Sequence, residues 1–289
     1  MAEFANWQWV DLEETSSTND EVKRLCTAAP SGKRFMVAAR RQNAGRGRRG
    51  RGWVSLEGNL FVSFGLEVAP QLLGQMTFVV GLSLLEAVRE LAPQADVCLK
   101  WPNDVLVGGG KVSGILLEKA AGNYLVVGVG VNIVAAPQCD SILYPVVSLK
   151  QAGVITDRTA FLHAFVRAYD RNLNCWENEG FAPIRENWLK HAKNLGAGIT
   201  VNMEKERKTG KFAGVDENGV LLLETPSGIE KIYADYPEGD ARTDALLQKG
   251  GTSIWAALLY FGIVLLLSSL VINLAGPGFV QYAMAMAGY

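Results

Sequence analysis

Residues 42–53 read Gln-Asn-Ala-Gly-Arg-Gly-Arg-Arg-Gly-Arg-Gly-Trp, and this loop joins two segments, 34–40 and 59–66, that have the composition of buried strands. Six arginines fall between positions 40 and 51 of a chain whose formal net charge is only −1. Arginine presents a rigid fork of donors to phosphates and carboxylates, and glycine lets the backbone approach a ligand closely. The loop therefore predicts one anionic ligand bound at one place.

The composition around this loop is that of a folded protein without a basic surplus. Of the 289 residues, 49% are hydrophobic and 20% are charged, which is enough apolar material for one large domain or two smaller ones. The near-neutral charge argues against nucleic acid as the main partner. The N-terminal residues 1–10 lack the apolar core of a signal peptide.

The cysteines and histidines bear on metal binding and on the compartment. The four cysteines, Cys26, Cys98, Cys139 and Cys175, are widely spaced and have no metal-ligand pattern, and there are only two histidines. We therefore expect no metal site built from side chains, and thiols that stay reduced. Reduced thiols without a signal peptide favour a cytoplasmic protein.

Outward from the loop, the sequence alternates predicted strands and helices. A helix is expected after Ser16-Ser17-Thr18-Asn19, with Thr18 or Asn19 as its cap. The apolar periodicity predicts further helices over 72–91, 159–179 and 181–195, and strands over 97–101, 104–107, 111–119 and 124–133. Residues 1–195 are therefore predicted to form one domain with an α/β fold.

The pattern changes after Gly196. Short strands are expected over 199–203, 211–215, 220–224 and 229–233, separated by turn sequences such as Asp-Glu-Asn-Gly and Thr-Pro-Ser-Gly. This predicts a small antiparallel barrel or meander over 196–237, followed by a linker over 238–250.

The remaining residues, 251–289, form an apolar tail without a charged residue. Residues 254–272 are long and apolar enough to cross a bilayer as a helix, since about 20 such residues span the hydrocarbon core. The tail reads as a membrane anchor with Arg242 and Lys249 on the cytoplasmic side, as an aberrant C-terminus, or as a helix packed on this protein or on a partner.

Several short motifs occur together, in a fixed order along the chain. They are Ser17-Thr18-Asn19, the loop 42–53, Lys100-Trp101-Pro102-Asn103-Asp104, the segment 108–118 and Gly128-Val129-Gly130-Val131-Asn132. In order and spacing they resemble the biotin protein ligases, over about residues 10–235, and linked motifs are more specific than one Gly-rich string.

The resemblance implies an α/β (α+β) catalytic domain of the class II aminoacyl-tRNA-synthetase-like type with a mixed sheet, not a Rossmann sheet. It also implies a small C-terminal SH3-like β-barrel. The apolar tail, expected as a C-terminal helix, has no counterpart in the family.

The resemblance implies a two-step ligase. The carboxylate of biotin attacks the α-phosphate of ATP, giving biotinyl-5′-AMP and pyrophosphate. A lysine amine on a biotin carboxyl-carrier domain then attacks the mixed anhydride and releases AMP. Fixed cations stabilise the charge at the α-phosphate, and Mg²⁺ is expected on the phosphates. Biotin and ATP are the expected substrates, the carrier protein of a carboxylase is the expected partner, and a homodimer is compatible with the family.

The resemblance also assigns roles to the first two motifs. Ser17, Thr18 and Asn19 would contact the biotin ring, with Gln42 beside them, because short hydroxyl and amide groups suit a polar ureido ring. Gly45, Arg46, Gly47 and Arg48 would belong to a loop that covers the adenylate, with Arg46 and Arg48 as direct contacts to the carboxylate and α-phosphate. The alternative for this loop is a disordered Arg-Gly tract that binds RNA.

In the later motifs, Lys111 resembles the essential lysine of the family, which would neutralise the α-phosphate and the carboxylate. Asp104 would orient Lys111 or a magnesium ion, with help from Asn103. Gly114 would let the backbone approach biotin, and Asn132 would lie near the nucleotide. Trp53 and Trp101 would pack around the adenine or biotin, or belong to the core.

Two alternative functions stay open at this point, and one activity of some relatives is not expected. Some biotin ligases carry an N-terminal helix-turn-helix domain, and because Ser17-Thr18-Asn19 lies near the start of this chain we expect no operator binding and no DNA partner. Lipoate ligases and octanoyl transferases have a related fold but lack this arginine-glycine loop. An Arg-Gly nucleic-acid binder would lose affinity steeply with salt and would not need biotin.

Overall fold

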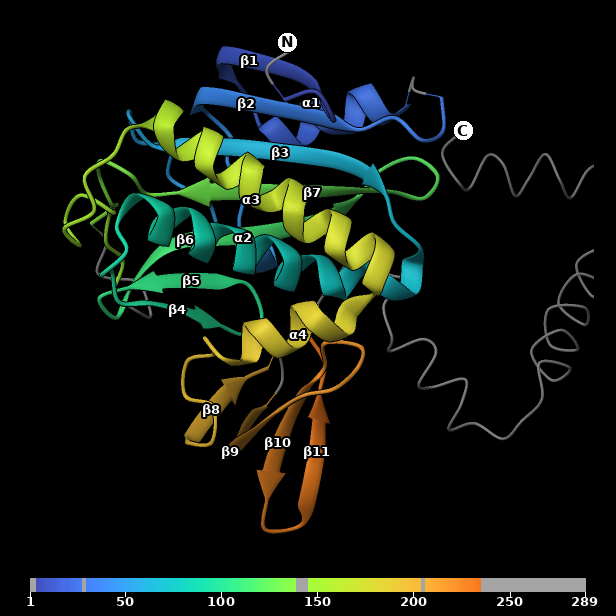
Figure 1. The fold of residues 1–289 in the computed structure, drawn as a ribbon, viewed down its shortest axis with the longest axis vertical. Coiled ribbons are helices and arrows are strands. Elements are labelled where there is room, and N and C mark those ends of the chain that lie inside the picture. The colour runs from blue at the N-terminus through green and yellow to red at the C-terminus, as the bar shows by residue number, and fades with distance from the viewer. Residues whose placement is uncertain (1–3, 28–29, 139–144, 204–205, 235–289) are drawn as a thin grey trace, which may run out of the picture. The chain divides into compact units, whose positions relative to one another are not determined.

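A seven-stranded mixed sheet with the strand order β1-β2-β3-β7-β6-β5-β4 forms the centre of the computed structural model, which describes residues 4–27, 30–138, 145–203 and 206–234 (Figure 1). The strands are β1 (Gln8–Thr15), β2 (Phe35–Gln42), β3 (Leu60–Glu67), β4 (Val97–Lys100), β5 (Asp104–Val107), β6 (Gly110–Lys119) and β7 (Tyr124–Val131). Strands β1 and β2 pair in parallel, and the other neighbouring pairs are antiparallel.

Helices cover this sheet. They are α1 (Thr18–Thr27), α2 (Met76–Leu91), α3 (Arg158–Glu179) and α4 (Phe181–Leu189), with short 3-10 turns at Arg48–Gly50 and Pro70–Gln75. Figure 1 shows α2 and α3 side by side along the sheet, and they contact each other. Helix α1 contacts β2, β3 and β7. Alternation along β2 separates two cores, because Met36 and Ala38 belong to the larger cluster whereas Phe35 and Val37 join Val22 of α1 in a smaller one.

Helix α2 lies in the larger core. Residues 70–91 are the one helical stretch among the described residues that is long and apolar enough to span a membrane. In the folded protein, 83% of an 18-residue apolar stretch of this helix is buried. A helix that is apolar around most of its circumference and buried in this way is a core helix of the domain.

A second, smaller sheet follows α4. It is antiparallel in the order β11-β10-β9-β8, from β8 (Gly198–Asn202), β9 (Arg207–Val215), β10 (Leu221–Thr225) and β11 (Gly228–Ile232). The β9–β10 turn is organised by Asp216, whose carboxylate accepts hydrogen bonds from the backbone N–H groups of Asn218 and Val220. Gly219 lies directly against the ring of Phe78 on α2, so that a Cβ there would come within 2.6 Å of it. The small sheet is thereby seated on the large domain.

The predicted α/β fold with a mixed sheet, followed by an antiparallel unit, is confirmed, and most strand limits lie within about two residues of the expectation. Strand β9 begins earlier than predicted, at Arg207. The N-terminal strand β1 was not predicted, because it is a largely exposed edge strand without apolar alternation.

The predicted helix 181–195 is wrong at its C-terminal end. It stops at Leu189 because the chain then pairs with β4: the Leu99 N–H donates to the His191 carbonyl at 2.8 Å, and the Lys193 N–H donates to the Leu99 carbonyl at 2.7 Å. The linker 238–250, the apolar tail 251–289 with its predicted membrane helix 254–272, and Cys139 lie outside the described residues.

Candidate active site

A cavity of about 1010 Å³ lies between the 42–53 loop, the start of α1, strands β6 and β7, and the small sheet. This volume is at the upper end for small-molecule sites, which fits a ligand with several chemical groups. Asp104 is the one carboxylate among the described residues that line it. The cationic lining residues are Arg46, Arg48, Arg49, Arg51, Lys100, Lys111 and Lys193. The cavity is therefore strongly positive although the chain as a whole is not.

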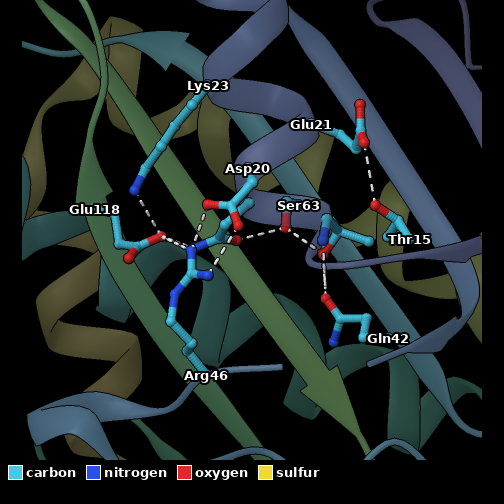
Figure 2. Close-up of polar contacts among 10 residues, drawn as sticks. Thr15, Asp20, Glu21, Lys23, Gln42, Arg46, Ser63 and Glu118 are labelled. Atoms are coloured by element: carbon cyan, nitrogen blue, oxygen red, sulfur yellow. Dashed lines mark hydrogen bonds and ion pairs between the residues drawn. The ribbon is translucent and has the colours of Figure 1, made fainter. Parts of the chain in front are cut away.

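At one end of the cavity lies a hydroxyl–amide cluster formed by Ser17, Thr18, Asn19, Gln42 and Ser63. Thr18 donates to the Gln42 side-chain oxygen from its backbone N–H at 2.9 Å and from its hydroxyl at 3.1 Å. The Ser63 hydroxyl lies 2.7 Å from the Thr18 hydroxyl and 2.6 Å from the Asn19 side-chain oxygen, and its single proton can be donated to one of them at a time (Figure 2). Thr18, Asn19, Gln42 and Ser63 are thus linked through hydrogen bonds, and Ser17 lines the cavity beside them.

The geometry decides against the capping role that the sequence allowed for Thr18 or Asn19. Helix α1 begins at Thr18, and the first backbone N–H groups bond to the Ser17 carbonyl. The Asn19 side chain is turned inward, with its amide nitrogen 2.7 Å from Glu118 on β6. The backbone N–H of Thr18, which has no partner within the helix, donates to the side-chain oxygen of Gln42 on β2. A side chain from a neighbouring strand therefore satisfies the start of the helix.

Two members of this region, Ser63 and Glu118, were not predicted. Ser63 is fully buried in the apolar strand β3, and Glu118 lies near the end of β6. A single serine in Leu-Phe-Val-Ser-Phe-Gly-Leu is the signal that could have identified the first of them, since a buried hydroxyl needs a partner. Glu118 carries no comparable signal.

The arginine-glycine loop is folded back on itself. The Trp53 N–H donates to the Gly45 carbonyl at 2.9 Å, and the Gly47 N–H donates to the Arg51 carbonyl at 2.6 Å. A Cβ at Gly45 would lie 2.6 Å from the Trp53 carbonyl, so glycine permits this closure. Gly45 does not line the cavity, whereas Gly47 does. The loop is an ordered hairpin-like element over the cavity rather than an extended tract.

Arg46 and Arg48 have different surroundings. The Arg46 guanidinium bonds to both oxygens of Asp20, at 2.9 and 2.5 Å, and lies 3.4 Å from Glu118. The hydrogen bond with Arg46 holds the pKa of the Asp20 carboxyl below its usual value and raises the pKa of Arg46 itself. Arg48 instead donates to the Asn103 side-chain oxygen at 2.9 Å.

Lys111 and Asp104 form an ion pair at the other end of the cavity, with 2.6 Å between the ammonium nitrogen and a carboxylate oxygen. Asn103 completes this region, because its amide nitrogen donates to the Ile115 carbonyl while its oxygen accepts from Arg48. We call Arg48, Asn103, Asp104 and Lys111 the cationic wall. These four residues come from four different segments, namely the loop, the β4–β5 turn, β5 and β6.

Glycines at the floor of the cavity make room for the Trp53 ring. Gly114 and Gly130 are register partners on β6 and β7, and a Cβ on them would lie 3.0 and 2.4 Å from the Trp53 ring. The indole therefore lies flat against bare backbone, with the Lys111 ammonium 5.8 Å from the ring centre. The Trp53 indole nitrogen and the Asn132 side-chain oxygen are buried and have no hydrogen-bond partner among the described residues.

The sequence-predicted residues are thus largely brought together. Those that line the cavity are Ser17, Thr18, Asn19, Gln42, Arg46, Gly47, Arg48, Asp104, Lys111, Gly114 and Asn132, whereas Gly45 belongs to the loop but does not line the cavity. Trp101 also lines it, and its indole donates to the Gly219 carbonyl at 3.2 Å, which ties it to the small sheet. The described residues contain no group of three or more His, Cys, Asp or Glu side chains arranged to hold a metal.

Comparison with known proteins shows which family this chain resembles. Residues 12–132 match the Biotin/lipoate A/B protein ligase family, and residues 195–234 match the Biotin protein ligase C terminal domain. A biotin–[acetyl-CoA-carboxylase] ligase of Paracoccus denitrificans is 39% identical over 236 residues, which are 77% of this chain and 97% of that protein. The chain belongs to the biotin protein ligase family.

Two further members of the biotin protein ligase family extend the comparison. The bifunctional ligase/repressor BirA of Bacillus subtilis is 33% identical over 234 residues, which are 77% of this chain and 70% of that protein. The biotin protein ligase of Aquifex aeolicus, solved in complex with biotin and ATP, superposes with a TM-score of 0.67 at 31% identity, over 78% of this chain and 95% of that one.

Proposed function

We propose that this chain is a biotin–[biotin carboxyl-carrier protein] ligase, which activates biotin with ATP and transfers it to a lysine of the carrier domain of a carboxylase. The observation that carries the proposal is one cavity with a fixed hydroxyl–amide cluster at one end and the cationic wall at the other. A neutral polar ring and a charged adenylate need these two environments side by side. The relatives named above are biotin ligases, which favours biotin over lipoate or octanoate as the acyl substrate.

In the first step, a carboxylate oxygen of biotin attacks the α-phosphorus of ATP, and the bond from that phosphorus to the bridging oxygen of pyrophosphate breaks. Both reactants are anions, so a fixed cation between them lowers the repulsion and stabilises the charge of the transition state. Lys111, held by Asp104 at 2.6 Å, and Arg48, held by Asn103 at 2.9 Å, are the cations whose geometry suits this role. Because their partners orient them in advance, little reorganisation is needed at the moment of reaction.

In the second step, a neutral lysine amine of the carrier attacks the acyl carbon of biotinyl-5′-AMP. The carbon–oxygen bond to AMP breaks, AMP leaves with the electron pair, and the amine loses a proton as the amide forms. The same cations stabilise the departing phosphate. The folded loop over the cavity would keep water from the mixed anhydride until the carrier arrives.

We include Mg²⁺ in the proposal as an ion carried by the ATP phosphates. Magnesium is commonly held by one or two carboxylates together with substrate phosphates and water. Asp104 is the carboxylate in the described cavity lining, and one of its oxygens is paired with Lys111. This donor set fits an ion bound mainly by ATP, and the ion would supply further charge neutralisation at the phosphates.

For the domain organisation we propose a class II aminoacyl-tRNA-synthetase-like catalytic domain over 1–195, an SH3-like barrel over 196–237 and a linker over 238–250. The seven-stranded mixed sheet and the four-stranded antiparallel sheet support the first two.

We further propose that the enzyme is cytoplasmic and that the tail 251–289 tethers it to a membrane, which its apolar composition supports. Pelleting with membranes that resists salt and carbonate tests the tether, and a wholly soluble full-length protein would contradict it. A sequence-specific DNA footprint would contradict the expectation that the chain does not bind an operator.

The activity is tested by ATP-dependent transfer of labelled biotin to a purified carrier domain. Wild type should label the carrier, should release one pyrophosphate per biotin, and should not use lipoate. Arg48→Ala and Lys111→Ala should each slow the transfer strongly, because each removes one cation of the wall. Arg167→Ala, on the exposed side of α3, is the matched control and should transfer at the wild-type rate. Unchanged turnover in both wall variants would refute the site.

A further inference from the structure

Arg46 takes part in a charged network that is separate from the cationic wall. Its guanidinium makes a two-pronged contact with Asp20 on α1, and one of the same nitrogens approaches Glu118 on β6 at 3.4 Å. Lys23, one turn further along α1, lies 3.2 Å from the same Glu118 oxygen. We call Arg46, Asp20, Lys23 and Glu118 the loop anchor, and Figure 2 shows the four side chains converging.

The loop anchor is balanced in charge, with two cationic and two anionic side chains. A two-pronged arginine–carboxylate contact uses the fork of the guanidinium in its preferred geometry. A substrate phosphate could take Arg46 only by displacing Asp20. The Arg46 guanidinium is therefore already occupied by a carboxylate of α1, which argues against a direct contact between Arg46 and the adenylate.

The loop anchor is also continuous with the hydroxyl–amide cluster. The Glu118 oxygen that meets Lys23 and Arg46 accepts a hydrogen bond from the Asn19 amide at 2.7 Å, and the Asn19 oxygen accepts from Ser63 at 2.6 Å. The Asn19 side chain occupies the space that a side chain at position 128 would need, since a Cβ on Gly128 would lie 2.3 Å from its oxygen. One carboxylate oxygen thus joins the loop to the groups that would recognise the ring.

We propose that Arg46 is a positioning residue that fastens the 42–53 loop over the cavity through Asp20 and Glu118, and that it is not a ligand of the adenylate. The inference rests on the proposed function and refines the role of one residue in it. Loosening the anchor frees the start of the loop and lets bound biotin leave, whereas Arg48 keeps its own bond to Asn103, and Lys111 and Asp104 lie on strands outside the loop. Binding weakens while the chemical step keeps its rate.

Asp20→Asn separates this role from direct contact. If Arg46 bound the α-phosphate, removing its competing carboxylate would leave ligation unchanged or improve it. If Arg46 is an anchor, Asp20→Asn should reproduce the defect of Arg46→Gln. Asp11→Asn is the matched control, because Asp11 forms a two-pronged pair with Arg158, at 3.0 and 2.5 Å, and does not line the cavity.

The experiment uses the full-length chain and measures the dissociation rate of labelled biotin, the KM for biotin and the kcat of transfer to a carrier domain. Arg46→Gln and Asp20→Asn should each raise the dissociation rate and KM by about threefold to tenfold, as expected for a partly exposed ion pair within a network, with kcat unchanged. The double variant should be no worse than either single one, because both remove the same contact. High salt should bring wild type toward the variants.

Three results would overturn the inference: a lowered kcat in Arg46→Gln with an unchanged dissociation rate, wild-type behaviour of Asp20→Asn, or additive defects in the double variant. A rise in dissociation rate with Asp11→Asn equal to that with Asp20→Asn would also overturn it, since the effect would then be a general loss of stability. Failure of the proposed function looks different, because wild type itself would then neither bind nor transfer biotin.

Discussion

The hydroxyl–amide cluster at the α1 end of the cavity is neutral and largely buried, whereas the Lys111–Asp104 pair at the β5–β6 end is charged and partly accessible. Thr18, Asn19 and Ser63 are at most 4% exposed and hold one another in place. Lys111 and Asp104 are 22% and 15% exposed and meet as a single ion pair. Neutral groups can be buried cheaply when every partner is present, but charges keep some contact with water or with their counter-charge.

This difference teaches how one cavity can separate recognition from chemistry. A rigid set of hydroxyl and amide groups discriminates between ligands, because a ligand without matching polar groups leaves these buried groups unpaired. Long cationic side chains stabilise charge that appears during the reaction. Changes at the first end should therefore raise KM, and changes at the second should lower kcat.

The largest effect is expected for Lys111→Gln at the cationic wall. Removing the ammonium should lower kcat for biotin-dependent pyrophosphate release by about 100-fold to 1,000-fold, with little change in the KM for biotin. Lys193→Gln, also on the cavity lining, is the control and should lose much less. Equal losses in the two variants would show that only the total charge of the cavity matters.

Next comes Ser63→Ala at the neutral end. It removes a fully buried hydroxyl that lies between the Thr18 hydroxyl and the Asn19 side-chain oxygen, so the KM for biotin should rise about tenfold and the free energy of unfolding should fall by about 1–3 kcal/mol. Ser83→Ala removes another fully buried hydroxyl, which donates to the Val79 carbonyl. It should lower the free energy of unfolding to a similar degree but leave the KM for biotin unchanged. A raised KM in both variants would show that lost stability, and not the neutral end of the cavity, determines the KM.

Gly130→Ala tests the floor that both ends share. The new methyl group would lie within 2.6 Å of the Trp53 indole, so the ring must move or the strand must shift. The free energy of unfolding should fall by about 1–3 kcal/mol, with a change in tryptophan emission. Gly198→Ala, where no atom lies within 4 Å of the added methyl, should keep the wild-type unfolding temperature.

The smallest effect concerns pH at the loop anchor. Burial raises the pKa of the Glu118 carboxyl, but the Asn19 hydrogen bond and the Lys23 and Arg46 charges outweigh it, and the pKa lies below its usual value. A carboxyl with a lowered folded-state pKa stabilises the fold above its unfolded pKa, about 4, and this stabilisation is lost as the pH falls through the folded value. Below about pH 4 the biotin dissociation rate should rise in wild type, and Glu118→Gln should show a weaker pH dependence.

Most of the site could be predicted from the sequence because its residues lie in short, contiguous motifs. Ser17-Thr18-Asn19, the arginine-glycine loop and Lys111 each belong to such a motif, and the fold brings them to one cavity. Ser63, Glu118 and Asp20 could not be found in this way, since they matter only through the pairing of distant strands and the orientation of α1. The same reasoning explains the missed strand β1, whose place depends on its parallel partner β2 and not on its own alternation.

The seating of the small sheet on the large domain has a consequence for how the protein melts. The cavity lining passes from β6 and β7 to Ile199, Val201 and Asn202 of β8, so a ligand in it would touch both sheets. A ligand that binds only the folded form stabilises every element that must be intact to hold it. Saturating biotin and ATP should therefore merge the unfolding of the two sheets into one transition at higher temperature, and calorimetry of the loaded and empty protein would register this as a gain in cooperativity.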